Sequence, residues 1–135
     1  MDQPLPNYEL TFYQRDGYLH ALIRSDTMTA EMAVEYLAAV AAECRKSKNE
    51  LLLLERDVPV MLNDIDLFNT TKYFLDLIGD RYVAFVNPHL AIVKDMDFAI
   101  LVGTNRGANY QLFNNVPDAV EWLLRHDFGR SRKSA

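Results

Sequence analysis

Cysteine is almost absent from the sequence, and long apolar runs are absent altogether. Cys44 is the only cysteine, so no intrachain disulfide can form and a disulfide-stapled fold is excluded. Its position on the apolar side of an expected helix favours a packed, unreactive thiol. No apolar stretch approaches the roughly 18 residues of a membrane-spanning helix, and the opening letters, MDQPLPNYEL, lack the basic and apolar regions of a signal peptide. We therefore expect a cytoplasmic protein with no membrane span.

A clustered basic surface is also missing. The formal net charge is −5, and the basic residues gather only within residues 45–48 and 125–133. Cations at the end of a helix complement its dipole, and a basic tail is usually solvated. Nucleic-acid binding needs a basic face that neutralises phosphates. We therefore expect no nucleic-acid partner.

The composition is that of an ordinary globular domain, with 50% hydrophobic and 24% charged residues. A chain of 135 residues is long enough to bury a core without a metal or a disulfide. We expect a single domain over residues 8–126. A short lead over residues 1–7 and a flexible basic tail over residues 127–135 would flank it.

Strand and helix patterns alternate along this domain. Near its start apolar and polar side chains alternate, and Asp16-Gly17 favours a two-residue type I′ hairpin turn. Apolar residues at helical spacing, with Thr29, Asn63 and Asn115 as caps, predict helices. The expected strands are residues 8–14, 18–24, 51–54, 82–86 and 110–113. The expected helices are residues 30–47, 64–78, 90–102 and 116–124.

Four consecutive leucines at residues 51–54 decide the fold class. Because they do not alternate with polar residues, they are typical of a strand covered on both faces in a parallel sheet. Strands that alternate with helices require a largely parallel sheet with right-handed crossovers. We predict an α/β domain of order β-β-α-β-α-β-α-β-α. Its mixed, mostly parallel sheet opens with a hairpin and has residues 51–54 near its centre.

These features together resemble the STAS domain, and more narrowly the bacterial STAS-like proteins grouped with the sporulation anti-sigma-factor antagonist. The resemblance covers residues 8–125. It rests on the opening hairpin, the leucine strand that runs into an acidic turn, and the strand, asparagine and AVEWLL of residues 110–124. It implies a non-enzymatic regulatory module that binds a protein. It also implies a serine or threonine after the central strand, whose phosphorylation switches binding to an anti-sigma kinase.

The matching turn here, residues 55–64 (ERDVPVMLND), contains no hydroxyl residue. The nearest are Thr70 and Thr71, two turns into the next helix, where a phosphate would lack the backbone donors of a helix N-terminus. We therefore expect a module that is not phospho-switched at the usual position. Capping and the helix dipole explain Asn63, Asp64 and Asp66, but the turn also lies where open α/β sheets bind ligands.

Two binding hypotheses remain open. The first is a surface for a protein partner, or for a second copy, formed by the turn at residues 55–66 and the helix that follows. The second is a site for an anionic or apolar metabolite in the cleft beyond the strand ends, where glycines flanking Arg106 could expose backbone amides to an anion. The residues predicted for the first surface are Asp57, Met61, Leu62, Asn63, Asp64 and Phe68. Those predicted for the second are Asn87, His89 and Arg106.

Enzymatic chemistry has the weakest support in the sequence. Asp57, Asp64 and Asp66 could approach a cation such as Mg²⁺, but no known metal motif is present. His89 could act as an acid or a base, but no serine or cysteine partner can be read beside it. We expect no catalytic residues, no metal and no cofactor.

Overall fold

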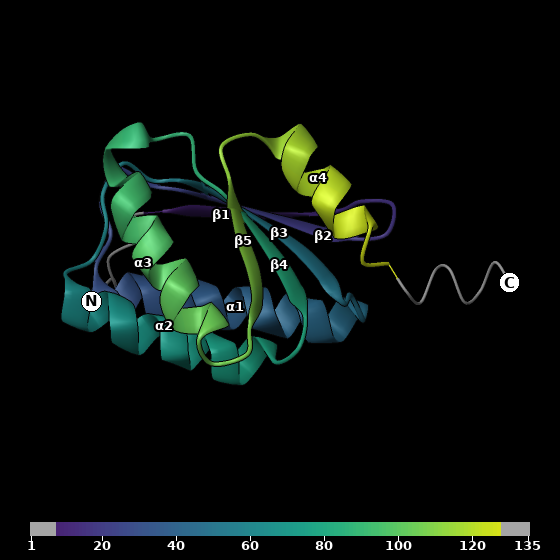
Figure 1. Cartoon of the computed structure of the whole chain (residues 1–135), viewed down its shortest axis with the longest axis horizontal. Coiled ribbons are helices and arrows are strands. Elements are labelled where there is room, and N and C mark those ends of the chain that lie inside the picture. The colour runs from purple at the N-terminus through teal and green to yellow at the C-terminus, as the bar shows by residue number, and fades with distance from the viewer. Residues whose placement is uncertain (1–7, 128–135) are drawn as a thin grey trace, which may run out of the picture.

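The computed structural model describes residues 8–127, and its centre is a five-stranded sheet (Figure 1). The predicted lead, residues 1–7, and residues 128–135 of the predicted tail lie outside the described residues. The strands follow one another in chain order; the first pair is antiparallel and all other neighbours are parallel. The predicted mixed sheet, with the leucine strand at its centre, is therefore confirmed. The strands are β1 (Glu9–Gln14), β2 (Leu19–Arg24), β3 (Leu51–Asp57), β4 (Tyr82–Val86) and β5 (Asn109–Phe113).

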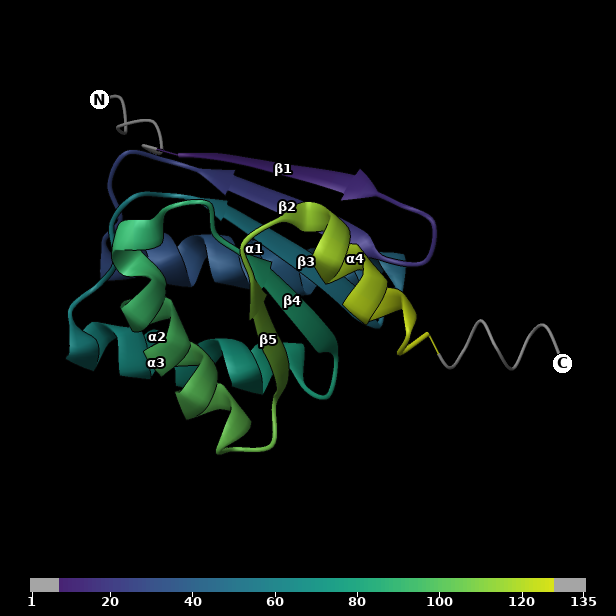
Figure 2. The same ribbon diagram turned by 45° about the horizontal axis from the view of Figure 1, so that its top comes forward.

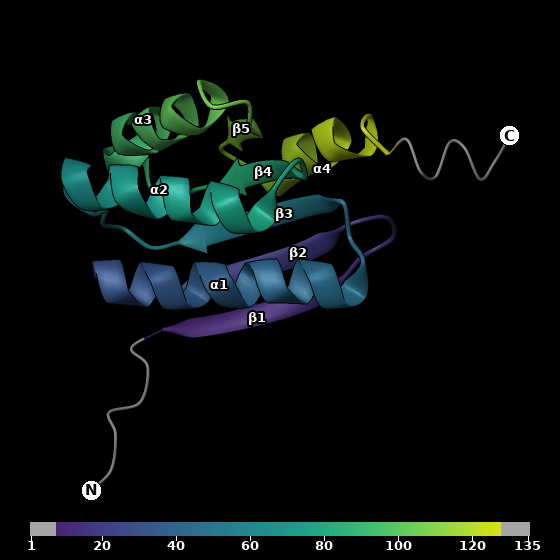
Figure 3. The same cartoon turned by 90° about the horizontal axis from the view of Figure 1, so that it is seen from below.

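Helices cover the two faces of the sheet unequally. Each helix between parallel strands connects one strand to its immediate neighbour, and all three connections run in the same direction across the sheet. Because such connections are right-handed, helices that cross in the same direction lie on the same face of the sheet. Helices α1, α2 and α3 therefore lie side by side on one face, which Figure 3 shows from the helix side. Figure 2 shows α4 on the opposite face, where it packs on β3 and β4. The helices are α1 (Ala30–Ser47), α2 (Asp64–Ile78), α3 (Val93–Thr104) and α4 (Val116–Leu124), with a 3-10 turn, η1 (Leu90–Ile92), before α3.

The four leucines of β3 divide between two cores. Leu52 and Leu54 pack with residues of α1, α2 and α3, whereas Leu51 and Leu53 pack with Leu123 of α4. None of the four is more than 3% exposed. Burial of one leucine side chain contributes about 1.5–3 kcal/mol, so β3 is held strongly from both sides. The predicted covering of this strand by helices is confirmed.

Three helices begin where the capping residues predict. The side-chain oxygens of Thr29, Asn63 and Asn115 each accept a hydrogen bond from the backbone N–H three residues later, at 2.9–3.1 Å. A cap of this kind contributes about 1 kcal/mol. Local sequence therefore sets the starts of α1, α2 and α4.

The hairpin between β1 and β2 differs from the prediction in its turn type. Gln14 pairs with Leu19, and the Arg15 N–H donates to the Tyr18 carbonyl at 2.9 Å, so the chain reverses at Asp16-Gly17 as predicted. Gly17 has a φ of 92°, but Asp16 lacks the positive φ that a type I′ turn requires. Tyr18, directly after the turn, is buried in the core beneath α4.

Strand β3 is longer than predicted, because residues 55–57 continue the ladder with β2. Charged side chains are accommodated there by partners on neighbouring segments. Glu55 Oε1 lies 2.9 Å from His20 Nε2, and Asp57 is bound by Arg24 and His89. The predicted turn therefore begins only at residue 58.

The third helix begins and ends later than predicted. The sequence predicts that Gly103 ends this helix, but Gly103 lies inside the last turn of α3. A Cβ atom at this position would lie 2.6 Å from two ring carbons of Tyr110. Gly103 therefore permits close packing of α3 on β5 and does not terminate the helix.

Candidate functional site

The carboxyl ends of the parallel strands meet at one edge of the sheet, here called the carboxyl edge. Glu55 of β3 pairs with Val86 of β4, and Val86 pairs with Phe113 of β5. Open α/β sheets bind their ligands at such edges. The segments that leave the carboxyl edge are residues 25–29, 58–63, 87–92 and 114–115.

Asp57, the last residue of β3, joins two other segments at the carboxyl edge. Its Oδ2 accepts a hydrogen bond from Arg24 Nε at 3.0 Å, and its Oδ1 lies 2.8 Å from His89 Nε2. The hydrogen bond with His89, and then that with Arg24, lower the pKa of the Asp57 carboxyl below its ordinary value. The sequence predicts Asp57 and His89 for two different sites, and the structure brings them together.

Arg24 belongs to this cluster, and sequence reasoning missed it. It is the last residue of β2, where a charged side chain is unremarkable, and it pairs in register with Asp57. The two side chains meet because β2 and β3 are parallel neighbours. Only the strand order, which the sequence does not state, would have revealed the pair.

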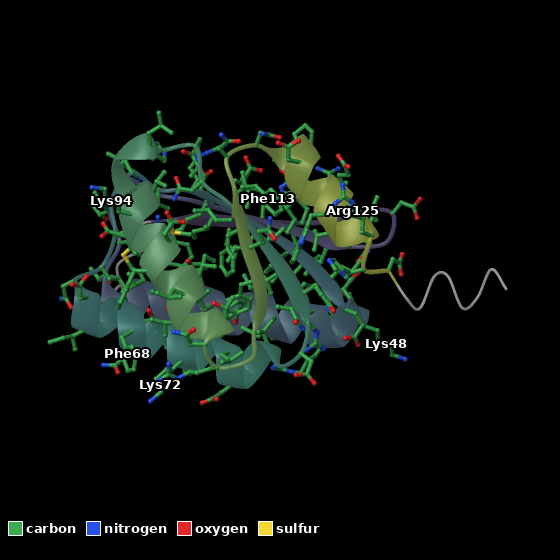
Figure 4. All side chains as sticks on the ribbon, in the orientation of Figure 1. Lys48, Phe68, Lys72, Lys94, Phe113 and Arg125 are labelled. Carbon is green, nitrogen blue, oxygen red and sulfur yellow. The ribbon has the colours of Figure 1, made fainter. Side chains whose placement is uncertain are left out.

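Asn87 follows β4 and is only 2% exposed. Its Oδ1 accepts a hydrogen bond from the backbone N–H of His89 at 2.8 Å, which fixes the orientation of the amide because only the oxygen can accept. Its Nδ2 is buried and has no hydrogen-bond partner within residues 8–127. Asn87 also lines a mainly apolar groove of about 380 Å³. The other lining residues are Leu90, Val93, Leu112, Asn114 and Phe113, which is labelled at the end of β5 in Figure 4.

Large apolar side chains are exposed at the carboxyl edge. Leu90 is 77% exposed and Ile65 is 74% exposed, the highest values among the large apolar side chains that the structure describes. Leu90 begins η1 and Ile65 lies in the first turn of α2, so both belong to segments that leave adjacent strands. Val60, in the loop before α2, is also exposed. These three exposed apolar side chains lie on the segments that follow β3 and β4.

The residues predicted for the turn have different environments. Met61 and Leu62 are half-buried and pack against the core on the side of α1, α2 and α3. Asn63 is the cap of α2, and Asp64 is exposed in the first helical turn, where a negative charge suits the helix dipole. Packing, capping and the dipole therefore account for these four residues.

Phe68 and Arg106, predicted for different sites, meet away from the carboxyl edge. The Arg106 guanidinium lies 4.9 Å from the centre of the Phe68 ring, and Lys72 Nζ lies 5.4 Å from it. Figure 4 shows Phe68 and Lys72 on the same stretch of α2. Arg106 follows the 12 residues of α3, about 18 Å of helix, whereas His89 precedes them. The structure therefore does not bring Arg106 into one site with Asn87 and His89.

Reactive groups are few in the described part of the chain. Cys44 is fully buried, and burial raises the pKa of its thiol to about 11, so it is not a ready nucleophile. Across residues 8–127 no group of three His, Cys, Asp or Glu side chains is placed to hold a metal ion. Within the same range, no helix combines the length and the apolar character needed to span a membrane.

Comparison with known proteins gives a structural likeness. No family model matches the chain, and no curated protein matches it in sequence. The crystal structure of an anti-sigma factor antagonist from Mycobacterium paratuberculosis matches it with a TM-score of 0.63 at 13% sequence identity. The match covers 91% of this chain and 98% of that chain. The chain therefore has the STAS-like fold.

Proposed function

We propose that the chain is a non-enzymatic STAS-like module that binds a protein through the carboxyl edge. The observation that carries this proposal is the exposure of Ile65 and Leu90 on segments that leave adjacent strands. Apolar side chains in the centre of a contact supply much of the affinity of protein interfaces. The groove beside Leu90 adds a concave apolar surface to the exposed side chains.

The acidic residues around this surface indicate what kind of partner it favours. Asp64 and Asp66 lie in the first turn of α2, and Asp95 lies in the first turn of α3. Complementary charge speeds association and selects among partners. The favoured partner therefore presents apolar side chains bordered by lysine or arginine.

We further propose that the module is not phospho-switched at the usual position. Thr70 is 5% exposed, and its hydroxyl donates to the Leu67 carbonyl at 3.2 Å. The Thr71 hydroxyl donates to the same carbonyl at 2.7 Å. Both hydroxyls are therefore engaged by their own helix, two turns away from the donors of its N-terminus.

A pull-down with matched variants tests this function. The purified chain, Leu90→Asp and Leu101→Asp would each be immobilised and exposed to extract of the cells that encode the protein. Leu101 is 55% exposed in the second half of α3, so its variant controls for loss of an exposed leucine elsewhere. We expect the wild type and Leu101→Asp to retain one discrete protein, and Leu90→Asp to lose it. If the partner is a second copy of the chain, sedimentation would show a dimer of the wild type and of Leu101→Asp but not of Leu90→Asp. Identical retention by all three would contradict the proposal.

A further inference from the structure

We propose that a cavity between the sheet and helices α1, α2 and α3 binds a medium-chain carboxylic acid. Its carboxylate would lie at Arg56, and a second polar oxygen at the far end of its apolar body would lie at Tyr110. Both residues line the cavity, together with side chains of β4, of the three helices and of the loop before α2. This site is distinct from the exposed residues of the carboxyl edge, and the inference does not depend on the proposed protein partner.

Arg56 supplies the anion-binding end. It is 4% exposed, and on β3 it alternates onto the same side as Leu52 and Leu54. Its Nη1 donates to the Val58 carbonyl at 3.2 Å and its Nη2 to the Val60 carbonyl at 2.7 Å. A guanidinium carries five N–H groups, so three have no acceptor among residues 8–127.

No carboxylate within residues 8–127 forms an ion pair with Arg56. Burial of a cation without a compensating anion costs folding free energy. An anionic ligand would therefore form both an ion pair and hydrogen bonds with the Arg56 guanidinium. A guanidinium fork matches the two oxygens of a carboxylate. Arg56 is also the only charged residue that lines the cavity, which favours a ligand with a single negative charge.

Tyr110 supplies the far end. It is 7% exposed, and its hydroxyl is buried without a hydrogen-bond partner in the described part of the chain. The ring cannot turn toward solvent, because it lies against Gly103 and between Phe74 and Phe85, with ring centres 6.3 and 5.1 Å away. Burial raises the pKa of the Tyr110 hydroxyl, so it stays protonated and can donate to a ligand oxygen.

The sheet register separates the two polar groups. Tyr110 pairs with Val83, and Val83 pairs with Leu52, so Tyr110 lies level with Leu52. Arg56 lies four residues farther along β3, a distance of about 13 Å at ~3.3 Å per residue. Apolar side chains line the space between. The arrangement fits a molecule with an anionic end, an apolar body and a polar atom at the other end.

The proposed ligand requires the cavity to enlarge, and the lining is suited to repacking. Its volume of about 60 Å³ exceeds the ~10–15 Å³ that one water needs, but it is smaller than a medium-chain acid. Three of the lining residues are methionines, namely Met28, Met61 and Met96. Methionine side chains are unbranched and repack readily around ligands of different shape. Met61 lies in the loop before α2, and the proposed site requires this loop to move outward as the ligand enters.

Methionine methyl NMR on the full chain tests the site directly. The chain has five methionines, and labelled methyl groups would be followed while decanoate or 10-hydroxydecanoate is added. We expect the methyl signals of Met28, Met61 and Met96 to shift and saturate. Those of Met32 and Met1 should stay in place, because Met32 does not line the cavity and Met1 lies outside the described residues. Shifts in Met32 alone, or no saturable shift, would overturn the proposal.

Two variants and an uncharged ligand separate the two ends. Arg56→Lys keeps the charge but loses the fork, so we expect it to weaken decanoate about tenfold or more and to leave 1-decanol unchanged. Tyr110→Phe removes only the hydroxyl and preserves the ring. We expect it to weaken 10-hydroxydecanoate severalfold, down to the affinity of decanoate, which it should not alter. If the wild type bound 1-decanol and decanoate with equal affinity, Arg56 would not be the carboxylate site. If Tyr110→Phe still bound 10-hydroxydecanoate more tightly than decanoate, Tyr110 would not contact the ligand hydroxyl.

Discussion

Asp57 holds the ends of β2 and β3 and the segment after β4 together through Arg24 and His89. The carboxylate is about a third exposed, so solvent screening keeps the contribution of each pair small, below ~1 kcal/mol. The importance of the cluster is positional. It connects the strand ends that precede the segments carrying the exposed side chains of the carboxyl edge.

The pH dependence of stability tests this cluster. The pKa of Asp57 is depressed in the folded chain, so its stabilising effect is fully present above the ordinary value of about 3.8. The effect is lost as the pH falls through the lower folded value. We expect Asp57→Asn to lower the free energy of unfolding at pH 6, and this deficit to be smaller at pH 3, as measured by urea denaturation.

Asp80→Asn is the matched control, because Asp80 is exposed and its carboxylate forms no ion pair in the described range. Its effect on the free energy of unfolding should stay near zero at both pH values. A deficit in Asp57→Asn that did not change with pH would contradict the ionic role.

Some residues of the carboxyl edge and of the cavity can be predicted from the sequence, and others cannot. Asp57, Asn87 and His89 can be picked out because they follow strands. Arg24 and Arg56 cannot, because a basic residue at a strand end reads as a solvated charge. Their roles depend on strand order and on which face of β3 is covered, and both arise from long-range packing.

At the scale of elements, α3 and β5 depend on a single close approach. Gly103 has no side chain at the point where α3 crosses the Tyr110 ring, and the neighbouring rings of Phe74 and Phe85 leave that ring no room to move. Alanine is a better helix former than glycine by about 1 kcal/mol, so helix propensity alone would make Gly103→Ala stabilising.

We expect Gly103→Ala instead to lower the free energy of unfolding by about 1–3 kcal/mol, because the added methyl group overpacks the contact with Tyr110. Thermal and urea unfolding would measure it. Thr104→Ala, at the next and exposed position, should change stability by no more than about 0.5 kcal/mol. An increase in stability for Gly103→Ala would show that the two elements are not tightly packed.

Elements set by local chemistry are predictable from this sequence, and those set by packing are less so. The caps Thr29, Asn63 and Asn115 give three helix starts correctly. The turn type of the hairpin, the last three residues of β3 and the end of α3 differ from the prediction. At β3 and α3 a distant contact overrides the local signal: the partners of Asp57 and the Tyr110 ring against Gly103.

At the scale of the whole molecule, strands in chain order gather three helices on one face and leave α4 on the other. All the loops that leave the parallel strands then open at the carboxyl edge. The interior cavity lies between the sheet and the three-helix layer. The fold thus separates the exposed apolar residues of the carboxyl edge from the cavity beneath the three helices.

Photo-crosslinking in living cells tests the central claim, that the carboxyl edge is the protein-binding surface. A photoreactive phenylalanine would replace Leu90 or, as control, Leu101. We predict a discrete crosslinked adduct from position 90 that Ile65→Asp in the same chain removes, and none from position 101. An adduct from position 101 with none from position 90, or one that Ile65→Asp leaves unchanged, would contradict the account.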